Sequence, residues 1–130
     1  MFEIKLYDKR FESAVMDLMR AEGEDWSCYW AGNSAEKYKQ ALATSITYVA
    51  LWDGEVAGYS RALQDAFFLY VFDLLVTAEY RGHQFGKKLL EHLAADFPDL
   101  PVYILSGNDK YYSGQGLEKA GSIYRLKQQP

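Results

Sequence analysis

The stretch LLVTAEYRGHQFGKKLL, residues 74–90, decides how this chain folds. An apolar run ends at Val76, a polar turn with Arg81 and Gly82 follows, and Gly86 precedes an amphipathic run. This pattern predicts a strand, a tight turn and the start of a helix. The N-terminus of a helix carries unpaired N–H groups and a partial positive charge, and glycine lets an anion approach the backbone closely. The turn therefore has the parts of a pyrophosphate site, although an ordinary strand-to-helix loop explains the same residues equally well.

Upstream of this stretch the pattern predicts one strand and two helices. Residues 2–7 alternate apolar and polar side chains, which is typical of a strand with one wet face. Asp8 is placed to cap a helix that fades near Gly23. Residues 22–33 are dense in aromatic and acidic side chains and have no clear period, and a capping box at Asn33 predicts the second helix.

A hairpin and a buried strand lead into the turn. Residues 47–63 contain two strand-like runs around Asp53 and Gly54, the turn chemistry that a two-residue hairpin requires. Residues 67–76 are apolar on both faces, which predicts a central strand covered on each side. Together these runs predict an antiparallel meander.

Downstream of the turn the pattern continues with a helix from Gly86 that stops at Pro98. Residues 102–105 read as a short buried strand, residues 111–121 as a weak helix and residues 122–126 as a final strand. The predicted order is β-α-α-β-β-β-α-β-α-β. It defines an α/β (α+β) fold with a mixed, mostly antiparallel twisted sheet of about six strands flanked by helices.

Length and composition limit the organisation and the partners. The chain of 130 residues fits a single domain, 1–130, and its net charge of -4 argues against nucleic acid and anionic membranes as partners. Cys28 is the only cysteine, so no intrachain disulfide forms and a cytoplasmic location is expected. No apolar run approaches the roughly 20 residues of a membrane span. Cys28 with His83 and His92 does not make a credible zinc site, so we expect no metal.

The stretch from residue 74 to residue 90 resembles the acetyl-CoA signature of the GNAT superfamily, the Gcn5-related N-acetyltransferases. In the pattern [Q/R]-x-x-G-x-[G/A], the marked positions are held here by Arg81, Gln84 and Gly86. Gln84 is a departure, since the family usually has glycine there. The resemblance implies acetyl-CoA as cosubstrate, bound through backbone amides of the turn with positive charge from Arg81 and Lys87 nearby.

A second segment, YYSGQGL at residues 111–117, resembles the late family segment F-Y-x-x-x-G-F. The resemblance gives Tyr112 the role of protonating the departing thiolate. The family's cofactor-contacting Asn is Leu105 here, and Asn108 is a candidate substitute.

The resemblance also implies how the cosubstrate lies in the sheet. The central strand would end in a bulge near Leu75 and part from the next strand, so that backbone groups of Leu75 and Val76 pair with the pantetheine arm. The residues expected to bind the cosubstrate are then Leu75, Val76, Arg81, Gly82, His83, Gln84, Phe85, Gly86, Lys87, Asn108 and Tyr111.

The acceptor side is less defined. Asp73 is the only carboxylate inside the central apolar strand, and it is a candidate general base or, equally, a hydrogen-bonded structural group. Trp26, Tyr29 and Trp30 lie in the segment where the family builds its acceptor site, and Glu24 beside them suits a cationic acceptor or is a solvated loop charge. Cys28, in the same segment, is expected to be buried as a small hydrophobe.

The resemblance favours an enzyme that transfers an acetyl group from acetyl-CoA to a primary amine of a small, cationic molecule by direct attack on the thioester. Two alternatives stay open: acetylation of a protein N-terminus or lysine, and a non-catalytic acyl-CoA-binding regulatory module. The family's seventh strand is expected to be shortened or absent, which leaves a sheet edge for a partner subunit in a homodimer, or bare in a monomer.

Overall fold

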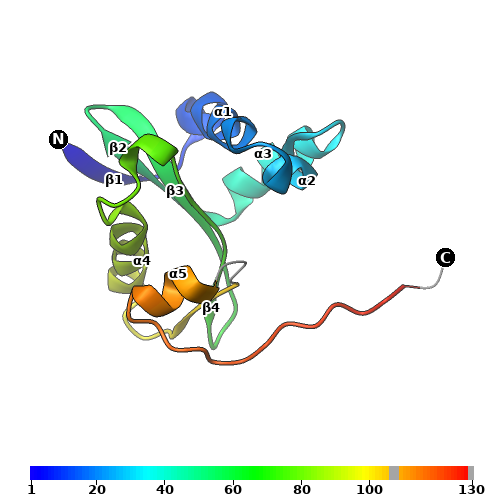
Figure 1. Ribbon diagram of the computed structural model, residues 1–130, viewed down its shortest axis with the longest axis vertical. Helices are drawn as coiled ribbons and strands as arrows, with labels where there is room; N and C mark the ends of the chain where they lie inside the picture. The colour runs from blue at the N-terminus through cyan, green and yellow to red at the C-terminus, as the bar shows by residue number, and fades with distance from the viewer. Residues whose placement is uncertain (106–108, 129–130) are drawn as a thin grey trace.

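The computed structural model describes residues 1–105 and 109–128, and its centre is a five-stranded sheet in the order β1-β2-β3-β4-β5 (Figure 1). The first four strands are antiparallel neighbours, and β5 joins β4 in parallel. The strands are β1 (Phe2–Leu6), β2 (Ile46–Trp52), β3 (Glu55–Gln64), β4 (Leu69–Val76) and β5 (Val102–Ile104).

Helices pack on the two faces of this sheet, and one more helix packs against the start of α4. Three short 3-10 helices are η1 (Lys9–Phe11), η2 (Glu24–Trp26) and η3 (Ala78–Tyr80). The α-helices are α1 (Glu12–Glu22), α2 (Ser27–Trp30), α3 (Ser34–Thr44), α4 (Phe85–Asp96) and α5 (Asp109–Gly114). Figure 1 shows α1, α2 and α3 together on one side of the sheet and α4 on the other.

Each face of the sheet has its own hydrophobic cluster. The first cluster joins α1 and α3 to the sheet, and its largest buried members include Met16, Met19 and Tyr59. The second cluster lies under α4 and is built around Leu89 and Leu93. A sheet covered on both faces explains why β4 is apolar on both faces apart from Asp73, as the sequence predicted.

A bulge in β4 decides which face its side chains reach. Arg61 pairs with Asp73 while Ala62 pairs with Val71, so Phe72 is an extra residue on β4. Because side chains alternate along a strand, one extra residue exchanges the two faces. Val71 accordingly belongs to the cluster under α4, whereas Leu75 belongs to the cluster under α1 and α3. The bulge was predicted near Leu75, and that position was wrong by three residues.

The hairpin and the first helix were predicted correctly. Asp53 and Gly54 have φ values of 50° and 85°, which the two-residue turn between β2 and β3 requires. The side chain of Asp8 accepts a hydrogen bond from the Arg10 amide at the start of η1, directly before α1. Gly58, opposite Val76, allows β3 to approach β4 closely, since a Cβ there would lie 2.7 Å from the carbonyl oxygen of Leu75.

Three local predictions were wrong. Residues 22–33 are helical in part, because a single turn such as α2 is too short to show a period. Asn33 precedes α3 but makes no side-chain capping bond. The last helix ends at Gly114 and does not reach residue 121.

The predicted sixth strand over residues 122–126 is also absent from the described chain. This segment is exposed and has no strand partner, and an unpaired strand gains neither ladder hydrogen bonds nor burial. Figure 1 shows it as an extended trace that leads away from the sheet. Within the described residues, no helix has the length and apolarity needed to cross a membrane.

Candidate active site

The turn between β4 and α4 presents backbone amides at the start of a helix. Gln84 precedes α4 with φ 66° and ψ 20°, the left-handed conformation that favours glycine. This conformation explains why the family pattern has glycine at this position. The N–H groups of the first turn of α4 have no intrahelical acceptor; they belong to Phe85, Gly86 and Lys87. No described side chain caps α4, so these groups are open to a ligand.

An aromatic cluster fixes this end of α4. Phe85 is buried, and its ring lies 4.4 Å from the ring of Phe2 and 5.6 Å from that of Tyr80. The His83 ring, exposed in the turn, lies 5.9 Å from Phe85. Phe85 therefore anchors the helix with its side chain while its amide faces the turn, and a ligand has only backbone to contact at this residue.

The side chain of Arg81 is already engaged by the protein. Its Nε donates to the carbonyl oxygen of Val76 at 3.0 Å, and its Nη2 forms an ion pair with Glu22 of α1. These contacts tie the end of β4 to α1. Arg81 therefore shapes the turn, and a charge reversal at this residue would disturb the fold as well as any bound anion.

Strands β4 and β5 part where the resemblance implies a gap. Their pairing runs from Leu69 to Val71, with a last hydrogen bond from the Leu105 amide to the Val71 carbonyl at 2.9 Å. From Phe72 to Val76, β4 has β3 on one side and no described strand on the other. The backbone of this unpaired half of β4 ends directly at the turn.

Helix α5 packs against the start of α4. The hydroxyl of Tyr111 lies 2.7 Å from the point where a Cβ on Gly86 would be, so glycine makes room for this ring. The Tyr111 and Tyr112 rings are perpendicular, with centroids 5.0 Å apart. Burial raises the pKa of Tyr112 to about 12, with a smaller contribution from Tyr111. An open hollow of about 380 Å³ lies between the two helices, lined by Gln84, Lys87, Lys88, Glu91, Gly114 and Gln115.

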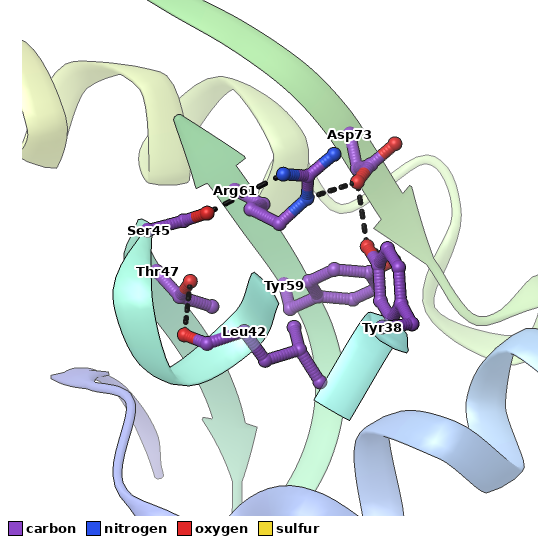
Figure 2. Close-up of polar contacts among 7 residues, drawn as sticks. All are labelled: Tyr38, Leu42, Ser45, Thr47, Tyr59, Arg61 and Asp73. Carbon is purple, nitrogen blue, oxygen red and sulfur yellow. Dashed lines mark hydrogen bonds and ion pairs between the residues drawn. The ribbon is translucent and has the colours of Figure 1, made fainter. Parts of the chain in front are cut away.

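Asp73 lies at the centre of a buried polar network (Figure 2). Its Oδ2 accepts from Arg61 Nε at 2.6 Å and from the Tyr38 hydroxyl at 2.5 Å. The hydroxyls of Tyr38 and Tyr59 lie 2.7 Å apart, and because Tyr38 gives its proton to Asp73, Tyr59 donates to Tyr38. Arg61 also donates to Ser45 Oγ at 3.3 Å.

Burial and the neighbouring carboxylate act together on this network. Burial, then the nearby Tyr59 and Asp73, raise the pKa of Tyr38 far above its usual value. Burial alone lowers the pKa of Arg61, but Asp73 outweighs it and the net change is upward. Burial, then Asp73, also raises the pKa of Tyr59 well above its usual value. Tyr38 and Tyr59 are therefore neutral hydrogen-bond donors, and Arg61 is a permanent cation at neutral pH.

Aromatic side chains connect this network to the N-terminal helices. The Tyr29 ring lies 4.4 Å from Tyr38 and 6.0 Å from Trp26, and the Arg61 guanidinium lies 6.0 Å from the Tyr29 ring centre. Burial, then Asp73, raises the pKa of Tyr29 to about 12. Trp30 donates from Nε1 to the carbonyl of Gly23 at 3.4 Å, which pins α2 to the end of α1.

The remaining residues of the acceptor segment face solvent. Glu24 is exposed in η2. Cys28, predicted to be buried, is exposed, whereas its neighbours Tyr29 and Trp30 in α2 are the residues that pack against the core. Groups of three or more metal-ligating side chains are absent from the described part of the chain.

The structure thus brings the predicted residues together in two places. The turn, the unpaired half of β4 and α5 form one group, and Asp73 with the aromatic residues of η2 and α2 forms the other. Asn108 lies outside the described residues. The sequence analysis missed Arg61, Tyr38 and Tyr59. A signal was present, since Arg61 is the only cation within the two strand-like runs of residues 47–63.

Comparison with known proteins identifies the family. The model of the acetyltransferase (GNAT) family matches residues 8–109. The chain therefore belongs to the GNAT family of acetyltransferases. No curated protein sequence matches it significantly.

Solved structures agree with this fold over nearly the whole chain. A GNAT-family acetyltransferase from Streptococcus pneumoniae TIGR4 is 25% identical, with a TM-score of 0.74 over 98% of this chain and 100% of that one. A ribosomal-protein-alanine N-acetyltransferase from Brucella melitensis biovar Abortus 2308 is 15% identical, with a TM-score of 0.78 over 98% and 99%. The aminoglycoside N-acetyltransferase AAC(6')-Iy, solved in complex with CoA, is 12% identical, with a TM-score of 0.73 over 100% and 96%.

Proposed function

We propose that this chain is an acetyl-CoA-dependent N-acetyltransferase that acts on the primary amine of a small molecule. The observation that carries the proposal is the parting of β4 from β5 after Val71, beside the uncapped N-terminus of α4. An extended pantetheine arm pairs with a free strand edge as another strand does. A pyrophosphate suits unpaired amides at a helix N-terminus. The free edge of β4 and the N-terminus of α4 lie next to each other, as the pantetheine arm and the pyrophosphate do in CoA.

The chain's own residues divide the work of holding the cosubstrate. Backbone groups of Leu75 and Val76 lie in the unpaired half of β4 and would hold the arm. Amides of residues 82–87 would hold the pyrophosphate, and Lys87 adds positive charge from the wall of the hollow between α4 and α5. Arg81 would contribute through the turn that it shapes, because its guanidinium is held by Val76 and Glu22.

The proposed reaction is direct transfer. The neutral amine nitrogen attacks the thioester carbonyl carbon, a C–N bond forms, and the C–S bond breaks. Tyr112 gives its hydroxyl proton to the thiolate, the nitrogen loses one proton to water, and water returns a proton to the Tyr112 phenolate. Burial raises the pKa of Tyr112 to about 12, so this phenol is protonated at neutral pH and has a proton to donate.

Of the two roles considered for Asp73, we propose that of a positioning residue. Proton transfer to Asp73 would break its 2.6 Å ion pair and leave the guanidinium of Arg61 charged and mostly buried. Instead the carboxylate fixes Tyr38, and Tyr38 in turn packs against Tyr29. The aromatic faces of Tyr29 and Trp26, with Glu24 on the exposed side, suit a cationic amine.

Calorimetric titration with acetyl-CoA tests the cosubstrate site. The variant Lys87→Glu reverses a charge beside the hollow and is expected to weaken binding about 10-fold or more, because like charges repel at close range. Lys9→Glu makes the same charge change at an exposed residue away from this hollow and is the matched control. Equal binding by both variants, or none by the wild type, would contradict the proposed site.

Thiol release in the presence of different amines tests the activity. Polyamines and amino sugars represent small acceptors, and peptides with a free N-terminus or a lysine represent proteins. We expect turnover with small amines, and a loss of about 100-fold or more in Tyr112→Phe with acetyl-CoA binding retained. Turnover with peptides alone would indicate a protein acetyltransferase. Binding without turnover of any amine would indicate a non-catalytic module.

A further inference from the structure

We propose that Glu22, the last residue of α1, is a positioning residue for acetyl transfer. Through Arg81 it fixes the Val76 peptide group at the open edge of β4, where the pantetheine arm would lie. This role rests on the proposed function, because it concerns how acetyl-CoA is held. Since α1 leads into the acceptor segment, Glu22 would join the two parts of the site.

The backbone of Val76 points away from β3 and into the open edge of β4. The amide of Thr77 donates to the carbonyl of Ala57 in β3 at 2.9 Å. Across a trans peptide bond the C=O and N–H groups point in opposite directions, so the Val76 carbonyl points away from β3. In a strand the N–H of a residue points to the same side as its C=O, so the Val76 N–H faces this edge too. Both groups are therefore presented on the side from which β5 has parted.

Arg81 holds the Val76 carbonyl with one nitrogen and Glu22 with another. Its Nε donates to the Val76 oxygen at 3.0 Å, and its Nη2 forms the ion pair with Glu22. The guanidinium is planar and its donors have fixed directions, so two simultaneous contacts define its orientation. The side chains of Arg81 and Glu22 are 50% and 26% exposed, and ion pairs with such exposure contribute little to stability. The pair therefore acts mainly on the orientation of Arg81 and, through it, on Val76.

The same end of α1 is tied to the acceptor segment. Gly23 follows Glu22 with a φ of 90°, which favours glycine, and its carbonyl accepts from Trp30 Nε1 at 3.4 Å. Trp30 and its neighbour Tyr29 belong to the aromatic group proposed to lie beside the amine. Two adjacent residues thus contact the acceptor segment and the β4 edge, so Glu22 helps to fix one reactant relative to the other.

The expected consequence concerns the pantetheine arm and not the pyrophosphate. The arm carries amide groups that can pair with the N–H and C=O of Val76. A carbonyl oxygen has two lone pairs, so the Val76 oxygen can accept from the arm and from Arg81 together. ADP carries a pyrophosphate without the arm. The ratio of the ADP and acetyl-CoA dissociation constants therefore reports the arm alone, because a change of charge near the turn acts on both ligands.

Calorimetric titration with acetyl-CoA and with ADP measures this ratio. Glu22→Leu removes the charge and the acceptor, and we expect the ratio to fall about 3- to 10-fold, the effect of one hydrogen bond. Glu22→Gln keeps an acceptor and should recover part of the loss. Asp17→Leu removes a carboxylate from an exposed ion pair with Arg20 on the same helix and is the matched control. An unchanged ratio in Glu22→Leu, or an equal fall in Asp17→Leu, would overturn the positioning role.

Thiol release at saturating acetyl-CoA and amine then tests the transfer itself. Turnover of Glu22→Leu should fall about 10-fold or more, because a loosely held thioester is less often within reach of the amine. Asp17→Leu should turn over like the wild type. Wild-type turnover in Glu22→Leu would contradict a role in transfer.

A double-mutant cycle shows whether Glu22 acts through Arg81. Arg81→Lys keeps the charge but loses the rigid fork of donors, so Glu22→Leu should change the ratio by less than about 2-fold in this background. A full loss there would refute the route through Arg81. Failure of the proposed function gives a different result, since the wild type then binds neither ligand, or binds acetyl-CoA no more tightly than ADP.

Discussion

The ion pair between Arg61 and Asp73 gives a sharp test of how the candidate site is held together. The two side chains are 12% and 3% exposed, and Nε and Oδ2 are 2.6 Å apart. Asp73→Asn is nearly isosteric but removes the negative charge, so the cation of Arg61 is left unpaired in a mostly buried place. Arg61→Met keeps apolar bulk but leaves the carboxylate without its cation, with the Tyr38 hydroxyl still donating to it. Each change therefore creates an uncompensated buried charge.

The expected magnitude follows from that imbalance. Loss of one partner of a buried pair typically costs about 3–5 kcal/mol of the free energy of unfolding. The double variant Arg61→Met/Asp73→Asn removes both charges, so its loss should fall short of the sum of the single losses by about 2 kcal/mol or more. A typical domain has a free energy of unfolding of about 5–15 kcal/mol, which leaves room to measure single variants.

These variants form a double-mutant cycle with the wild type. Urea denaturation of all four proteins at neutral pH gives the free energy of unfolding of each. Lys39→Met with Glu36→Gln, an exposed pair on α3, is the control, and its coupling should be below about 1 kcal/mol. If the losses at Arg61 and Asp73 simply add, the two charges do not depend on one another. In that case Asp73 is free to act as a general base, and the positioning role is refuted.

Three further predictions concern backbone strain, close packing and pH. Gln84→Gly should raise the free energy of unfolding by about 0.5–1 kcal/mol. Relief of the left-handed conformation gains about 1–2 kcal/mol, and the greater freedom of the unfolded chain costs about 0.4–1 kcal/mol. An unchanged urea midpoint would contradict this prediction. Gly58→Ala should cost about 1–3 kcal/mol, because its Cβ meets a β4 carbonyl oxygen at 2.7 Å, whereas Gly121→Ala, with open space around it, should be nearly neutral by the same assay. Stability should fall as pH rises above 10. The pKa values of Tyr29 and Tyr112 are each about 12 in the folded chain, against 10.0 in the unfolded chain. Between pH 10 and 12 the unfolded chain therefore loses protons that the folded chain keeps, which favours unfolding. The double variant Tyr29→Phe/Tyr112→Phe should flatten this slope in urea titrations, and an unaltered slope would argue against the burial of both phenols.

The sequence was sufficient for features that depend on neighbours along the chain. The Asp53-Gly54 turn, the cap at Asp8 and the helix after Gly86 follow from local conformational preference and from apolar periodicity. The order of strands followed from the same patterns up to β5. The quoted stretch also identified the turn, because glycine positions and charge are visible without coordinates.

Features set by contacts across the sheet were not accessible in this way. The position of the β4 bulge depends on its register with β3, and this register alone turns Asp73 toward Tyr38 and Arg61. The engagement of Arg81 by Glu22 joins residues far apart in the sequence, so the local pattern suggested only a free positive charge. The fate of residues 122–126 depends on whether a sheet edge receives them, and strand propensity carries no information about that.

The sequence by itself therefore determined the elements, their order and the turn with its helix N-terminus. The tertiary structure decided that Asp73 is an ion-pair partner and that β4 parts from β5 after Val71. It also decided that the C-terminal segment leaves its own sheet. The physical reason is that local preference acts over a few residues of chain, whereas register, burial and charge pairing are fixed only when distant strands meet.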